Sequence, residues 1–378
     1  MRLLLHIIHI DTLEALNALK EEWNTLLTNC KDKNIFLTHE WITTWWEYFS
    51  ERRDLFILLV KENERLIGIA PLMLTLKKIE FIGTPLSDYC DFIIEKEHEE
   101  ALKAIYGHLL ENRKLWRSIS LGEIPEKSLT LLLSPKILQG LTKYFNVSFS
   151  NPCFAVDFKG LTSDDVNAIT NKKGLRRHIN HFNQSGRLDF QKVNDLNDVY
   201  GALNVFFEQH IRLWAGRGML SMFNNQRYKE FIRSIAKNIL SNGNLGFWVL
   251  KFNDQIIAAS FGFEFNKVYI SYCQSHDLEY CKRSPGIIMQ KYLIEKLFEE
   301  GSHIVDFSRG AEVYKLRFSN KSSSNFGITI NKNIADYLLT RFYHSVRERI
   351  MKKNKLHSFL NKIRYKTIGI FSKSQASN

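Results

Sequence analysis

The order of predicted helices and strands constrains this chain most, because helices followed by a run of strands occur twice. In the N-terminal part, Asp11 begins a pattern of apolar residues at helical spacing that predicts a helix to about Asn29. Thr38 is expected to cap a second helix. Two apolar runs, 55–60 and 66–74, flank a short polar turn and predict a hairpin.

The C-terminal part has the same succession at greater length. Amphipathic patterns predict helices at 195–214 and 226–240. Strand-like runs at 246–251, 256–265 and 268–273 then follow with short polar turns, as in an antiparallel meander. The fold class expected is therefore α/β, with mixed sheets in two similar halves. The expected domains are residues 1–150, residues 151–335 and a tail at 336–378, with a boundary at Asn151-Pro152.

Composition excludes several classes of protein. The chain has 378 residues, of which 44% are hydrophobic, enough for a substantial core. Its five cysteines are scattered without a Cys-x-x-Cys pair, so we expect neither a disulfide framework nor a zinc site. No run approaches the roughly 18 apolar residues of a membrane span. The apolar run Leu3–Ile10 is interrupted by two histidines and predicts a strand instead of a signal peptide, so a cytoplasmic location is expected.

Positive charge is concentrated at the C-terminus. The whole chain carries a formal charge of +12, and residues 336–378 hold ten basic and two acidic residues, or +8 of that total. Apolar residues recur among the basic ones at near-helical spacing. This pattern predicts either a helix on the anionic inner surface of a membrane or a helix packed on the domain with a solvated basic face.

The segment that follows the meander is the best candidate for anion binding. Ser284 is expected to cap a helix, Pro285 suits its first position and Gly301 suits its C-terminal stop. A helix that begins just after a strand, with Gly286 in its first turn, offers free N–H groups to an anion. Lys282 and the adjoining arginine add positive charge. The chain lacks the glycine-rich motifs of dinucleotide-binding and P-loop proteins.

Two polar loops supply candidate reactive groups. A buried-type strand at 303–307 leads into a loop rich in ionisable residues, a usual place for an active site; its candidates are Asp306, Glu312, Tyr314 and Lys315. The loop at 87–91 offers Asp88, Tyr89 and Asp91 for a polar substrate, or else forms a simple turn. His178 and His181 lie one helical turn apart without a third ligand nearby, so no metal is expected.

These residues together resemble a known family. Arg283-Ser284-Pro285-Gly286, the run Val305 to Lys315, and the N-terminal segments Phe36 to Trp46 and Leu66 to Leu72 are similar to the CelD-like group of GNAT acetyltransferases, relatives of the FemAB transferases. The resemblance covers roughly residues 30–320. It implies a tandem GNAT-like fold and transfer of an acyl group from acetyl-CoA or another acyl-CoA to an amine or hydroxyl, without a metal.

The resemblance also implies residue roles. The donor would bind at Arg283, Ser284, Pro285, Gly286, Ile287 and Ile288, although Ile288 stands where the family motif has a small residue. Tyr314 would protonate the leaving thiolate or donate to the thioester carbonyl, and Glu312 or Asp306 would act as base, directly or through water. Lys315 would orient a carboxylate or phosphate, and His210 would be a base or substrate ligand. Structural roles compete for each: a buried helix histidine, a packed tyrosine with a surface lysine, and a strand-end cap.

Three functions remain open at this point. The first is acyl-CoA-dependent transfer, with an amino sugar or an envelope polysaccharide precursor as the acceptor that the family analogy suggests. The second is FemAB-like transfer from aminoacyl-tRNA, which would be bound by the basic tail and by the basic helix at 172–187. The third is a membrane or nucleic-acid adaptor without enzymatic activity.

Overall fold

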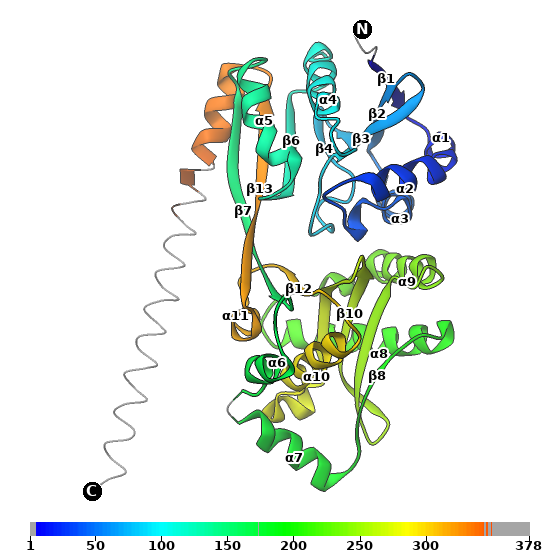
Figure 1. The fold of residues 1–378 in the computed structure, drawn as a ribbon, viewed down its shortest axis with the longest axis vertical. Helices are drawn as coiled ribbons and strands as arrows, with labels where there is room; N and C mark the ends of the chain where they lie inside the picture. The colour runs from blue at the N-terminus through cyan, green and yellow to red at the C-terminus, as the bar shows by residue number, and fades with distance from the viewer. Residues whose placement is uncertain (1–4, 173, 344, 347–348, 350–378) are drawn as a thin grey trace, which may run out of the picture.

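A single mixed sheet organises the part of the chain that the structure, a computed structural model, describes: residues 5–172, 174–343, 345–346 and 349. The sheet has 13 strands, and twelve of them follow the order β1-β2-β3-β4-β6-β13-β7-β12-β11-β10-β9-β8, while β5 pairs with β3. Figure 1 shows an N-terminal and a C-terminal half joined by the long strands β7 and β13. No helix among these residues is long and apolar enough to cross a membrane.

The N-terminal half alternates helices and antiparallel strands. Its elements are β1 (Leu5–Ile10), α1 (Leu13–Ala18), α2 (Lys20–Asn29), η1 (Ile35–Leu37), α3 (His39–Phe49), β2 (Asp54–Glu62), β3 (Arg65–Thr75), β4 (Lys78–Phe81), β5 (Ile93–Ile94), α4 (Glu100–Glu111), β6 (Ser118–Pro125), α5 (Leu129–Gln139) and β7 (Phe145–Asp157). The predicted β2–β3 hairpin and the Thr38 cap, whose side chain accepts from the Trp41 N–H, are confirmed.

The single helix predicted from Asp11 to Asn29 is wrong in detail. The chain forms two helices that meet at Leu19, and the side chain of Thr12, not Asp11, caps the first by accepting from the Ala15 N–H at 3.3 Å. Leu19 makes no side-chain cap, but its carbonyl accepts from the Trp23 N–H at 2.8 Å, and α2 buries the Trp23 side chain.

The C-terminal half repeats this layout. Its elements are α6 (Ser163–Thr170), α7 (Leu175–Ser185), β8 (Leu188–Lys192), α8 (Leu196–Ala215), η2 (Met222–Asn224), α9 (Gln226–Leu240), β9 (Leu245–Phe252), β10 (Gln255–Phe265), β11 (Val268–His276), η3 (Leu278–Arg283), α10 (Pro285–Glu299), β12 (Ile304–Arg309), α11 (Val313–Phe318) and β13 (Lys321–Asn331). The predicted meander of β9, β10 and β11 is confirmed, and β11 then pairs in parallel with β12.

The two halves exchange their last strands. In the N-terminal half β4 pairs in parallel with β6, as β11 does with β12 in the C-terminal half. The strand that ends the first half, β7, pairs with β12, whereas β13 pairs with β6 and lies beside β7. The boundary expected at Asn151-Pro152 therefore falls inside a continuous strand, because β7 belongs to the sheet of both halves.

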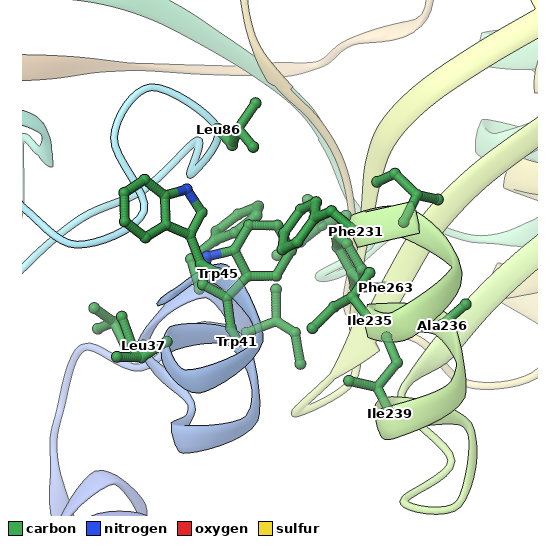
Figure 2. Close-up of a cluster of buried hydrophobic side chains, with 14 of the residues drawn as sticks. Leu37, Trp41, Trp45, Leu86, Phe231, Ile235, Ala236, Ile239 and Phe263 are labelled. Atoms are coloured by element: carbon green, nitrogen blue, oxygen red, sulfur yellow. The ribbon is translucent and has the colours of Figure 1, made fainter. Parts of the chain in front are cut away.

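A shared core holds the halves together. One cluster of buried side chains includes residues of both α3 and α9, and Figure 2 shows Trp41 directed toward Phe231 and Phe263. The ring of Trp41 lies 5.3 Å from that of Phe231 and 5.6 Å from that of Phe263. Aromatic pairs at these separations contribute beyond their buried area. The relative position of the halves is thus fixed by packing as well as by the exchanged strands.

Only the beginning of the predicted basic tail can be described. Residues 334–343 are helical and follow β13 directly. The apolar tail positions from Ile350 onward, among them Leu356, Phe359, Leu360 and Ile363, lie outside the described residues.

Candidate active site

The gap between two parallel strands creates the candidate site. β11 and β12 pair only at residues 268–270 and 304–306, and beyond these residues a cavity of about 600 Å³ opens. The cavity is lined from the loop after β4, the end of α8, β11, the start of α10 and the β12–α11 segment. Eight residues predicted for the site line it: Asp88, His210, Ser284, Gly286, Ile287, Glu312, Tyr314 and Lys315.

The start of α10 forms one wall of the cavity. Pro285 occupies the first helical position as predicted, but Ser284 is left-handed (φ 53°) and makes no side-chain cap hydrogen bond. The N–H groups of Ile287 and Ile288 instead donate to the Ser284 carbonyl at 3.0 and 3.1 Å. A Cβ added at Gly286 would lie 3.2 Å from Nδ1 of His276, so glycine lets the helix approach this histidine closely.

Three predicted donor-site residues do not line the cavity. Pro285 is buried, Ile288 is fully buried within a hydrophobic cluster, and Arg283 belongs to η3 just before the helix. Because Ile288 points into the core, its size does not obstruct the first turn of α10. The departure from the family motif at this position is therefore compatible with an open anion site.

A bulge at the end of β12 shapes the second wall. The pairing of β12 with β7 shifts register between Asp306 and Arg309, and Ser308 adopts a left-handed backbone (φ 63°) that is uncommon for a residue with a side chain. The Ser308 N–H donates to Oδ1 of Asp306 at 2.7 Å. Ser308 lines the cavity, while Asp306 lies just behind it.

The Asp306 carboxyl is also held by the N-terminal half. The Tyr89 hydroxyl donates to Oδ1 and Oδ2 of Asp306 at 2.9 and 2.8 Å. Burial raises the pKa of Asp306 to about 6, although the hydrogen bonds from Ser308 and Tyr89 oppose that rise. Asp306 and Tyr89, predicted separately as base and substrate ligand, are thus direct partners.

Asp88 reaches the cavity from the same loop and meets Arg309. Nε of Arg309 lies 2.6 Å from Oδ1 of Asp88, and the Ser308 hydroxyl donates to the other carboxylate oxygen. Burial raises the pKa of Asp88, and the charge of Arg309 counteracts it. Arg309 also lies 3.3 Å from Oε1 of Glu123 on β6. A partly buried charged cluster therefore links the cavity wall to the N-terminal half.

Asp91 does not join this cluster. It is buried within the N-terminal half, where its Oδ1 accepts from the Phe92 N–H at 2.8 Å, and it does not line the cavity. Burial raises its pKa to about 7, and the hydroxyls of Thr130 and Ser128 offset part of the effect. The interpretation of the 87–91 loop as a substrate-binding turn thus places only Asp88 at the cavity.

Short helix α11 brings three ionisable groups together. Lys315 is buried, with Nζ donating to the Arg309 carbonyl at 2.5 Å and lying 3.0 Å from Oε2 of Glu312. The Tyr314 ring lies 6.3 Å from that of Phe307, and burial raises the pKa of its phenol, which is protonated at neutral pH. The tyrosine is therefore a proton donor facing the cavity.

The histidine from α8 closes the opposite side. Nδ1 of His210 lies 2.8 Å from the Ser221 hydroxyl, and its ring stacks on Trp214 at 5.5 Å. Burial, aided by the charge of Arg217, lowers the pKa of His210 to about 4, so the imidazole is neutral at pH 7. Burial likewise lowers the pKa of His276 on β11.

Sequence reasoning missed Arg309, Glu123 and His276. Arg309 and His276 line the cavity, and Glu123 reaches Arg309 from β6. The adjacency of Arg309 to the polar end of β12 was a signal that could have found it. Nothing local marks Glu123, because its partners Ser150, Asn151 and Arg309 all come from other strands.

Comparisons with known proteins agree with this description. Residues 170–316 match the family model described as "Acetyltransferase (GNAT) domain", which spans the cavity-forming part of the C-terminal half. No curated protein matches the sequence. The mixed α/β architecture of two GNAT-like halves is thereby confirmed as the fold class.

Solved structures resemble nearly the whole chain. FemX aligns with a TM-score of 0.59 at 12% identity, covering 85% of this chain and 96% of FemX. The C-terminal domain (DUF2156) of a putative lysylphosphatidylglycerol synthetase from Agrobacterium fabrum aligns with 0.54 at 11% identity, covering 88% and 97%. L-PGS from Bacillus licheniformis aligns with 0.52 at 10% identity, covering 87% and 96%. At such low identities these likenesses show the fold alone.

Proposed function

We propose that the protein transfers an acyl group from acyl-CoA to an amine or hydroxyl at the cavity between β11 and β12. One observation carries the proposal. The first turn of the 15-residue helix α10, which contains Gly286, lines the same cavity as the buried Tyr314 and the neutral His210. The match of residues 170–316 to a GNAT acetyltransferase domain supports the same reaction class.

The start of α10 fits the pyrophosphate of an acyl-CoA. The positive end of the helix dipole and the nearby Lys282 and Arg283 favour negative charge there. Gly286 allows an anion to approach the backbone, and Ile288 stays out of the way in the core. Acyl-CoA supplies a thioester whose carbonyl carbon is open to attack.

The remaining residues would accept and donate the protons of the reaction. His210, with its imidazole neutral, or Asp306, with a pKa near 6, would take the proton from the attacking amine or hydroxyl as the new bond to the acyl carbon forms. Tyr314 would give its proton to the departing sulfur as the carbon–sulfur bond breaks. Lys315, joined to Glu312 and to the Arg309 carbonyl, would hold α11 and its tyrosine in place.

The acceptor class is a finer part of the proposal. The family resemblance suggests an amino sugar or an envelope polysaccharide precursor. FemAB-like transfer from aminoacyl-tRNA is the competing reaction, because it would use the same fold with a different donor. Its distinguishing property would be binding that weakens steeply with salt through basic segments such as α7.

Calorimetric titration with acetyl-CoA tests the donor. The unmodified protein should bind it, and Gly286→Glu should weaken binding roughly a hundredfold or more, because a carboxylate would face the phosphates at short range. Gly107→Glu is the matched control, since it makes the same change in α4 where an added Cβ meets no atom within 4 Å. This control should bind like the unmodified protein.

Two outcomes would overturn the proposal. One is unchanged acetyl-CoA affinity in Gly286→Glu, which would place the donor elsewhere. The other is absence of binding to acetyl-CoA and to longer acyl-CoA by the unmodified protein, with salt-sensitive binding of aminoacyl-tRNA instead.

A further inference from the structure

The helix at 334–343 is docked with its polar side inward. Asp336 is buried, and Nε and Nη2 of Arg117 donate to its Oδ1 at 2.9 and 2.6 Å. The Thr340 hydroxyl donates to Oδ1 of Asn331 on β13 at 3.0 Å. The Tyr337 ring lies 6.1 Å from that of Tyr144. Residues 336, 337 and 340 occupy one side of a helix, so this side anchors the segment to the domain.

The opposite side of the same helix is apolar and faces outward. Ile334, Leu338, Leu339 and Phe342 are 53%, 56%, 65% and 71% exposed. Their spacing of four, one and three residues places them on one face. A surface helix of a globular domain normally buries its apolar stripe, so this arrangement is inverted. Four large apolar side chains together on a helix that is already anchored indicate a partner for that face.

The charge of the adjoining sequence identifies the kind of partner. Residues 341–378 contain ten basic residues and one acidic residue, Glu348, a surplus of nine positive charges immediately after the apolar face. Apolar side chains with flanking lysines and arginines match an anionic lipid surface, where the former enter the headgroup boundary and the latter meet the phosphates. A nucleic acid would meet the same positive charges but would leave the four apolar side chains in water.

We propose that the face formed by Ile334, Leu338, Leu339 and Phe342, here called the apolar tail face, binds an anionic membrane surface. This binding is independent of the proposed acyl transfer. It would hold the domain at the surface by the end of β13, since the helix follows that strand directly and is fixed to it by Thr340.

Vesicle co-sedimentation with the full chain tests this proposal. Vesicles of phosphatidylcholine with phosphatidylglycerol should pellet the protein, and vesicles of phosphatidylcholine alone should do so weakly. The double variant Leu338→Asp/Phe342→Asp should lose about tenfold or more of the binding. Leu13→Asp is the matched control: Leu13 is an exposed leucine (37%) in the first turn of α1, where an acidic residue suits the helix dipole. It should bind like the unmodified protein.

A second variant separates charge from apolar contact. Lys352→Gln/Lys353→Gln/Lys355→Gln keeps the apolar tail face and should reduce the preference for phosphatidylglycerol and its salt sensitivity. Unchanged unfolding temperatures would show that each variant is folded.

The proposal fails if the double variant pellets with anionic vesicles like the unmodified protein, or if the unmodified protein does not bind these vesicles. In the second case, light scattering identifies the occupant. A dimer that the double variant converts to a monomer would assign the face to a second copy of the chain.

Discussion

The two halves of the molecule share a layout but differ at the helix that precedes the parallel-paired strand, which is β6 in one half and β12 in the other. In the C-terminal half, α10 begins after Lys282-Arg283-Ser284-Pro285-Gly286 and faces a cavity. In the N-terminal half, the corresponding α4 begins after Glu95-Lys96-Glu97-His98-Glu99, with Glu100 in its first turn. Acidic residues there stabilise the helix end but repel a phosphate. The start of α10 therefore suits the anion site that we propose, and the start of α4 does not.

The gap between parallel strands differs in the same way. Beyond the paired residues of β4 and β6, the loop after β4 returns to the sheet, and the Cys90 N–H donates to the Glu123 carbonyl at 3.0 Å. That loop also carries Asp88 and Tyr89 to the cavity wall of the other half. The N-terminal half thus contributes to the site by supplying ion-pair partners for Arg309 and a hydrogen-bond donor for Asp306.

The largest expected effect concerns the short helices after β12 and β6. Tyr314 is the second residue after the N-cap of α11, and Thr130 holds that position in α5. Tyr314→Phe should lower turnover by about a hundredfold to ten-thousandfold with little change in acetyl-CoA affinity, since it removes a proton donor and not a binding group. Thr130→Val should leave turnover unchanged. Thiol release from acetyl-CoA with a panel of amino sugars measures both, and equal losses would show that Tyr314 has no chemical role.

The next largest effect concerns the ion pairs of Arg309 that link the two halves. Arg309→Met leaves Asp88 and Glu123 without their cation, and breaking this partly buried ion pair should lower the free energy of unfolding by about 1.5–3 kcal/mol, less than for a fully buried pair. Arg65→Met, which removes the surface partner of Glu95, should cost less than about 1 kcal/mol. Urea denaturation compares them. Asp88→Asn combined with Arg309→Met should recover part of the loss; a strictly additive result would mean that the two side chains do not interact.

Sequence patterns identified the local features of this fold and missed the long-range ones. The hairpins and the start of α10 follow from turn chemistry and from Pro285, which act within a few residues. The exchange of β7 and β13 leaves no local mark, because a strand has the same alternation whichever neighbour it pairs with. The predicted boundary at Asn151-Pro152 therefore falls inside β7, because nothing local shows that this strand pairs with strands of both halves.

The site residues likewise divide into those that local sequence indicates and those that only the fold brings together. Glu312, Tyr314 and Lys315 were predicted from the polar loop after a core strand and His210 from the family resemblance, and all four line one cavity. The pairing of Asp88 with Arg309 spans 221 residues, so no spacing rule could indicate it. Asp91 has the same residue type and loop as Asp88, and only the fold separates their environments.

Asp91 provides a test confined to the N-terminal half. Its folded-state pKa of about 7 exceeds the ordinary value of 3.8, so folding favours its protonated form. Its contribution to stability is complete below about pH 4 and is lost as pH rises toward 7, a change on the order of a few kcal/mol. Asp91→Asn should remove this dependence and gain stability over the unmodified protein between pH 4 and 7, as measured by urea unfolding across that range. If the free energy of unfolding depends on pH in the same way in both proteins, a group other than Asp91 has the raised pKa.

Asp306 provides the corresponding test in the C-terminal half, with rate as the readout. If Asp306 takes the proton of the acceptor, turnover should fall as pH drops below about 6, because the carboxylate becomes protonated. Tyr89→Phe removes a hydrogen bond that stabilises this carboxylate. The acidic limb should then move upward by about half a pH unit to one unit, the worth of one such bond. An acidic limb of the pH–rate profile near pH 4 that does not shift in Tyr89→Phe would assign the base to His210, whose pKa is about 4. The pH–rate profile thus decides whether the N-terminal half tunes the chemistry through Tyr89 or only supports the cavity wall.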